Sequence, residues 1–142
     1  MIQKGGTMRN LKSLARLLER EERYIDGCGK VRYHRPGLAG AFYWGDKTIL
    51  TDGYWGVVAN GKIEGLTMAQ EEGADVEKIL FDMIDGHEKE SVTNFDNYPP
   101  EQVEMLLKCF DKTRKIYMVN RILFIQGKDG YAFIMPNKEG VK

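Results

Sequence analysis

The most regular hydrophobic pattern in the chain lies near its beginning. Apolar residues recur there at the spacing of one helix face, at Leu11, Leu14, Ala15 and Leu18. This spacing predicts an amphipathic helix over residues 8–24. Thr7 is the expected N-cap, and Gly27 lies just beyond the expected end of the helix.

Shorter segments rich in β-branched and aromatic residues follow, separated by Gly, Pro and Asp. They predict strands at residues 30–34, 41–44, 48–51 and 54–59. Asn60-Gly61 is typical of a two-residue hairpin turn, so residues 62–66 are expected to return as a further strand.

The second half of the chain is predicted to contain two helices followed by a run of strands. Helical spacing predicts helices over residues 75–84 and 99–110, and strands are expected at 115–119, 121–126 and 131–135. Strands that cluster in runs favour an α+β fold with antiparallel β-sheets, with two to three helices packed on one side. We expect a single domain over residues 1–142, with residues 1–7 as a flexible extension and no internal repeat.

The formal net charge is zero, but the charges are unevenly distributed. Residues 1–35 hold nine Lys and Arg against four Asp and Glu, whereas residues 64–111 hold three against thirteen. Five basic residues also project within one stripe of the first predicted helix, opposite its leucines: Arg9, Lys12, Arg16, Arg20 and Arg23. Faces of opposite sign suit contact with a polyanion and head-to-tail self-association, although chance variation among solvated faces produces the same pattern.

Residues that could carry catalysis are sparse. Cys28 and His34 lie six positions apart, where a bystander pair is more frequent than an activated thiol–imidazole pair. The acidic segment 71–75 lacks the ligand spacing of a calcium loop, and no glycine-rich loop precedes a helix as a phosphate site requires. We therefore expect no enzymatic activity, no metal and no cofactor.

The two cysteines and the apolar runs bear on location. Cys28 and Cys109 are far apart in a chain that is long enough to fold without a disulfide, so reduced thiols in a cytoplasmic protein are expected. No apolar run approaches the length of a membrane span, and no membrane association is expected.

Aromatic residues crowd one region of predicted strands, at Phe42, Tyr43, Trp44, Tyr54 and Trp55. Strand alternation sends some of them to each sheet face, and most are expected to build the core. An exposed remainder would form a surface on which a peptide or protein docks.

Two short segments resemble parts of the bacterial DNA polymerase sliding clamp, the processivity factor. Thr51-Asp52-Gly53-Tyr54-Trp55 is similar to the Thr-Asp-Gly-His-Arg-Leu strand motif of that family, and the strand over residues 131–136 resembles its C-terminal strand, which ends in Met-Pro. The order of elements from residue 99 to 135 also resembles a clamp half-domain. The chain departs from the family where Tyr54-Trp55-Gly56 replaces His-Arg-Leu, and it has the length of one domain whereas clamps have three.

The resemblance implies a non-enzymatic, clamp-like domain that binds DNA or a replication-type partner. It implies that the basic stripe contacts the phosphates of double-stranded DNA without reading sequence. It also implies a pocket for peptides of a polymerase-like partner, formed at Thr51, Gly53, Tyr54, Trp55, Met135 and Pro136. A ring would require a homo-oligomer. The alternative is an interaction module of a phage or mobile element that docks its partner protein on the aromatic surface and has no role on DNA.

Overall fold

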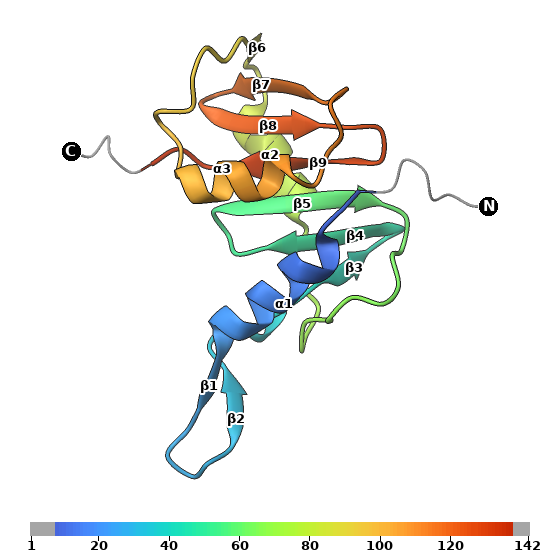
Figure 1. Cartoon of the computed structure of the whole chain (residues 1–142), viewed down its shortest axis with the longest axis vertical. Coiled ribbons are helices and arrows are strands. Elements are labelled where there is room, and N and C mark those ends of the chain that lie inside the picture. The colour runs from blue at the N-terminus through green and yellow to red at the C-terminus, as the bar shows by residue number, and fades with distance from the viewer. Residues whose placement is uncertain (1–7, 138–142) are drawn as a thin grey trace.

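Helices and strands cluster in runs along residues 8–137, which are the residues that the computed structural model describes (Figure 1). Within this range the helices are α1 (Leu11–Glu22), α2 (Val76–Ile84) and α3 (Pro100–Leu107), with a short 3-10 helix at Pro36–Leu38. The strands are β1 (Arg23–Ile25), β2 (Val31–Tyr33), β3 (Phe42–Trp44), β4 (Lys47–Thr51), β5 (Trp55–Asn60), β6 (Lys89–Glu90), β7 (Lys115–Val119), β8 (Ile122–Gln126) and β9 (Gly130–Ile134). These strands pair antiparallel in two sheets, so the predicted α+β class is confirmed.

The larger sheet has seven strands in the order β3-β4-β5-β9-β8-β7-β6. Two three-stranded meanders, β3-β4-β5 and β7-β8-β9, therefore join along β5 and β9. The meanders repeat each other in register, because Phe42 pairs with Ile49 in the first and Tyr117 pairs with Phe124 in the second. Both partners are shifted by the same 75 positions (42 to 117, and 49 to 124).

Two hydrogen bonds at the boundary between the meanders are related by the same shift of 75 positions. The N–H of Asn60 donates to the carbonyl of Asp129, and the N–H of Met135 donates to the carbonyl of Tyr54, each at 2.8 Å. The shift of 75 positions converts one bond into the other (60 to 135, and 54 to 129). The side chains at matching positions differ, so the fold contains an internal repeat that the sequence does not reveal.

Helices cover both faces of the larger sheet (Figure 1). Leu18 of α1 and Leu106 of α3 share one core with Trp55. Leu80 of α2 lies in a separate cluster with Phe124, whose side chain is on the opposite face of the sheet. Two helices therefore pack on one side, within the predicted number, and the third packs on the other side.

The first helix is shorter than predicted. It begins at Leu11, where Asn10 takes the N-cap position with φ 61°, and it ends at Glu22 in place of residue 24. Arg23 leaves the helix in an extended conformation and starts β1, a strand that the hydrophobic pattern does not predict. The carboxylate of Asp26 accepts the N–H of Lys30 at 2.9 Å and helps to turn the chain back into β2. The predicted N-cap, Thr7, lies outside the described residues.

The predicted return strand over residues 62–66 is wrong. β5 pairs with β4 along one edge and with β9 along the other. It therefore has no free edge with which residues 62–66 could pair. The hydroxyl of Thr48 donates to the carbonyl of Gly61 at 2.7 Å and accepts the N–H of Ile63 at 2.9 Å. These bonds hold the segment after β5 in an irregular course.

The second half agrees with prediction more closely. Asp75 caps α2 by accepting the N–H of Lys78 at 3.2 Å, and Pro100 occupies the first turn of α3. β7, β8 and β9 differ from the expected strands by a residue or less at each end. Among the described helices, none has the length and apolar character needed to cross a membrane.

Candidate functional site

The basic stripe lies on the solvent side of α1 and its flanks, opposite the side of the helix that packs into the core. All five predicted residues are exposed: Arg9, Lys12, Arg16, Arg20 and Arg23. Arg23 pairs with Glu19 at 3.3 Å. The other four form no ion pair with any residue in the range 8–137. Their charges therefore remain available to an external anion.

A hairpin formed by β1 and β2 continues directly from the end of α1 and projects away from the larger sheet (Figure 1). We call this hairpin, residues 23–33, the arm. Its register pairs Ile25 with Val31, whose side chains are 62% and 54% exposed. At the tip, Asp26 forms an ion pair with Arg32. The hydrogen bond from Arg32 and the backbone N–H groups of the tip hold the pKa of the Asp26 carboxyl below its ordinary value.

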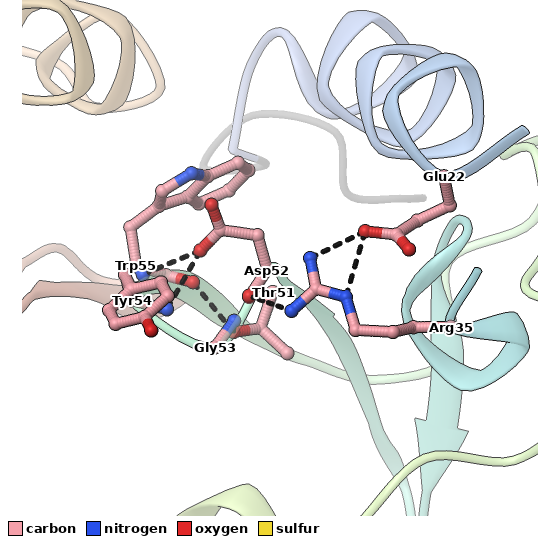
Figure 2. A network of polar contacts seen from close by, with 7 residues as sticks. All are labelled: Glu22, Arg35, Thr51, Asp52, Gly53, Tyr54 and Trp55. Carbon is pink, nitrogen blue, oxygen red and sulfur yellow. Dashed lines mark hydrogen bonds and ion pairs between the residues drawn. The ribbon is translucent and has the colours of Figure 1, made fainter.

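A polar network fixes the base of the arm (Figure 2). Arg35 donates through Nε to the Glu22 carboxylate at 3.0 Å and through Nη1 to the Asp52 carbonyl at 3.0 Å. The Glu22 side chain is only 6% exposed, and its hydrogen bond with Arg35 holds the pKa of that carboxyl below its ordinary value. The backbone joins the same point, since the N–H of His34 donates to the Glu22 carbonyl at 2.9 Å. Arg35 thus connects the end of α1, the exit of the arm and the β4–β5 turn.

The β4–β5 turn is the Thr-Asp-Gly segment, and its own side chains order it (Figure 2). The Asp52 carboxylate accepts the N–H groups of Tyr54 and Trp55 at 2.8 and 3.0 Å. The Thr51 hydroxyl donates to the Trp55 carbonyl at 2.6 Å and accepts the N–H of Gly53 at 3.0 Å. Gly53 has φ 96°, a left-handed conformation that other residues adopt at a cost.

The Met-Pro segment lies beside this turn. The N–H of Met135 donates to the carbonyl of Tyr54, because β9 runs antiparallel to β5. Met135 and Pro136 are half-buried, whereas Tyr54 is 64% exposed. The structure therefore brings together, with at least partial exposure, four of the six residues predicted to contact a partner: Gly53, Tyr54, Met135 and Pro136. Thr51 lies beside them but is 3% exposed, so it orders the turn and cannot be part of a partner surface.

Trp55 requires a correction. Its side chain is 2% exposed and lies in the core beneath α1 and α3, so it cannot be part of a partner surface. Phe42 is also buried and Tyr43 half-buried, whereas Trp44 and Tyr54 are exposed. The aromatic cluster is thus divided between core and surface. Phe42 and Trp44 lie on the same face of β3, but Trp44 is at the end of this edge strand, and Tyr54 lies in the turn before β5.

A pocket of about 390 Å³ opens next to Pro136. It is within the size range of small-ligand sites. The Tyr98 hydroxyl donates to the Arg121 carbonyl at 2.8 Å and helps to shape its wall. The lining residues are Asp96, Asn97, Tyr98, Met118, Arg121, Pro136 and Asn137.

The cysteines and histidines form no catalytic arrangement within residues 8–137. Cys28 lies in the exposed tip of the arm, whereas His34 lies at its base, where its ring stacks on Tyr24 with centroids 4.3 Å apart. Cys109 is buried, which raises the pKa of its thiol to about 12. Both thiols are free, and the described residues contain no group of three or more His, Cys, Asp or Glu arranged to hold a metal.

No protein-family model, curated protein or solved structure matches this chain. The resemblance to sliding clamps therefore depends on the short segments and the order of elements described above.

Proposed function

We propose that this chain is a non-enzymatic DNA-binding domain that contacts the phosphates of double-stranded DNA through the exposed basic stripe of α1. One observation carries the proposal: Lys12, Arg16 and Arg20 lie on the exposed face of α1, Arg9 lies just before the helix, and none of the four has an ion-pair partner among residues 8–137. Lys and Arg in this arrangement neutralise phosphates without reading bases. α1 has 12 residues and is about 18 Å long, so it spans about half of a DNA helical turn.

α3 does not extend this surface. Its exposed residues include Glu101 and Glu104, which would repel phosphates. DNA contact is therefore assigned to α1 and not to both helices of that face.

A clamp-like role with a replication-type partner is part of the same proposal. It is supported by the position of α1 and α3 on one face of the sheet and by the contact between Tyr54 and Met135. Under this proposal the exposed ring of Tyr54 and the pocket beside Pro136 receive a peptide of a polymerase-like protein. This surface is separate from the basic stripe, so the two activities can be tested independently.

Charge reversal on α1 tests the DNA-binding proposal. Lys12→Glu together with Arg16→Glu should weaken binding to a duplex of mixed sequence, because two attractive interactions with phosphates become repulsive. The slope of log K against log salt should also fall by about 0.9 for each phosphate that the variant no longer neutralises. Binding is measured by fluorescence anisotropy across a salt series, with thermal denaturation as the check on folding.

Lys78→Glu together with Lys115→Glu is the matched control, since it makes the same change in net charge on α2 and β7. This control should retain most of the affinity. If both double variants bind as the wild type does, or lose affinity equally, α1 is not the DNA-binding surface.

A further inference from the structure

The proposed phosphate contacts of α1 do not account for the arm, the hairpin that follows this helix. An isolated two-stranded hairpin has marginal stability in water, and β1 and β2 belong to no other sheet. The arm is nevertheless held by several polar contacts along its length. Tyr33 donates to Glu19 at 2.8 Å, Arg35 binds Glu22 at the base, and Arg32 pairs with Asp26 near the tip. The arm is therefore preorganised, so a partner that binds it does not have to order it first.

One face of the arm carries an unusual pair of apolar side chains. Ile25 and Val31 lie directly opposite each other, and they share this face with Arg23 and Tyr33 because side chains alternate along a strand. Both Ile25 and Val31 are more than half exposed. Arg23 is also the last member of the basic stripe. The apolar pair therefore lies on the face of the arm that begins at Arg23, directly after the end of α1.

The charges around this pair indicate what would cover it. The arm holds three basic residues, Arg23, Lys30 and Arg32, against one acidic residue, Asp26. Arg23 and Arg32 are ion-paired with Glu19 and Asp26, so Lys30 is the basic residue of the arm that has no ion pair among residues 8–137. An apolar pair within a basic projection, next to a basic helix, complements a surface that has phosphates at its borders and apolar groups between them. The major groove of DNA is such a surface, since thymine presents its C5-methyl group there.

The dimensions favour the major groove over the minor groove. Two strands lie about 4.8 Å apart, and side chains widen the ribbon further. The minor groove is about 6 Å wide, whereas the major groove is about 12 Å wide and admits a two-stranded ribbon.

We propose that the arm enters the major groove of double-stranded DNA and that Ile25 and Val31 contact thymine methyl groups, while α1 contacts the adjacent phosphates. This inference rests on the proposed DNA-binding function and assigns it a preference for A·T base pairs. Phosphate contact alone carries no such preference.

Removal of the methyl groups from the DNA tests the proposal without altering the protein. The probes are two A·T-rich duplexes of about 20 base pairs that differ only in thymine or uracil. We expect the wild-type chain to bind the uracil duplex roughly three- to four-fold more weakly for each methyl group contacted. Ile25→Ala with Val31→Ala should bind the thymine duplex as weakly as the wild type binds uracil, and it should not distinguish the two duplexes.

Ile79→Ala with Met83→Ala is the matched control, because these side chains are apolar and exposed on α2. It should discriminate between thymine and uracil as the wild type does. Equal wild-type affinity for the two duplexes overturns the assignment of the arm while leaving phosphate binding by α1 intact. Absence of binding to either duplex overturns the proposed function itself. A further outcome would also overturn the proposal. The wild type would bind the thymine and uracil duplexes equally well, and light scattering would detect a dimer of the wild type but not of the arm variant. The apolar pair would then be a contact with a second copy of the chain.

Discussion

At the scale of single residues, the two tryptophans have the same chemistry and different environments. Trp55 is 2% exposed and packs in the core, whereas Trp44 is 36% exposed at the end of the edge strand β3. The sequence places both in the same aromatic cluster and does not separate them.

Replacing each tryptophan by alanine should therefore have very different effects. Trp55→Ala should lower the free energy of unfolding by about 3–5 kcal/mol, because it removes a large buried side chain and leaves a cavity. Trp44→Ala should change it by less than about 1 kcal/mol, as is usual for surface positions. Urea denaturation monitored by circular dichroism measures both. Similar losses of stability in the two variants would contradict the division of this cluster between core and surface.

At the scale of elements, the contact between α1, the arm and the β4–β5 turn depends on one buried carboxylate. The pKa of Glu22 is lowered in the folded state by the hydrogen bond from Arg35, so the ionised form stabilises the fold. This stabilisation is present above the ordinary carboxyl pKa of 4.5 and is lost as the pH falls through the lower, folded value.

Glu22→Gln should lower the free energy of unfolding by about 1–3 kcal/mol at neutral pH, since the variant leaves Arg35 without its charged acceptor. The difference from the wild type should shrink as the pH falls below the ordinary carboxyl pKa. Denaturation curves at neutral and acidic pH measure this dependence.

The neighbouring Glu21 is the natural control. Burial, followed by the nearby carboxylates of Asp52 and Glu22, raises its pKa, so its ionised form costs stability at neutral pH. Glu21→Gln should therefore leave stability unchanged or increase it. If Glu21→Gln destabilises the fold as much as Glu22→Gln does, the contact with Arg35 is not what stabilises the base of the arm.

At the scale of the whole molecule, the clamp-like part of the proposal requires more than one copy of the chain. Within residues 8–137, a single copy presents one basic helix, α1, whereas the acidic residues of α2 and α3 lie in the second half of the chain. Assembly through faces of opposite sign predicts a discrete oligomer that dissociates as salt is raised, since ions screen exposed charges.

Light scattering coupled to size exclusion, over several protein and salt concentrations, measures this assembly. A monomer at every concentration would exclude a self-assembled ring. It would leave phosphate binding by α1 untouched, because that contact needs only one copy.

The sequence by itself determined the features that depend on neighbouring residues. The amphipathic stripe of α1, the Asp75 cap of α2 and the strands of the second meander follow from periodicity and local hydrogen bonding, which act within a few residues. The three members of the basic stripe that lie on α1, Lys12, Arg16 and Arg20, were predictable for the same reason, whereas Arg9 and Arg23 lie outside the helix.

Only the tertiary structure decided how distant segments meet. β5 pairs with β9 instead of turning back at Asn60-Gly61, because the inter-meander contact buries both strands and outweighs a local turn preference. The end of α1 at Glu22, the arm and the placement of Trp55 depend on Arg35, on Asp52 and on the packing of α1 and α3 above the sheet. The internal repeat lies in the backbone pairing of the two meanders, which have the same strand register but different side chains. The amino-acid sequence therefore does not predict it.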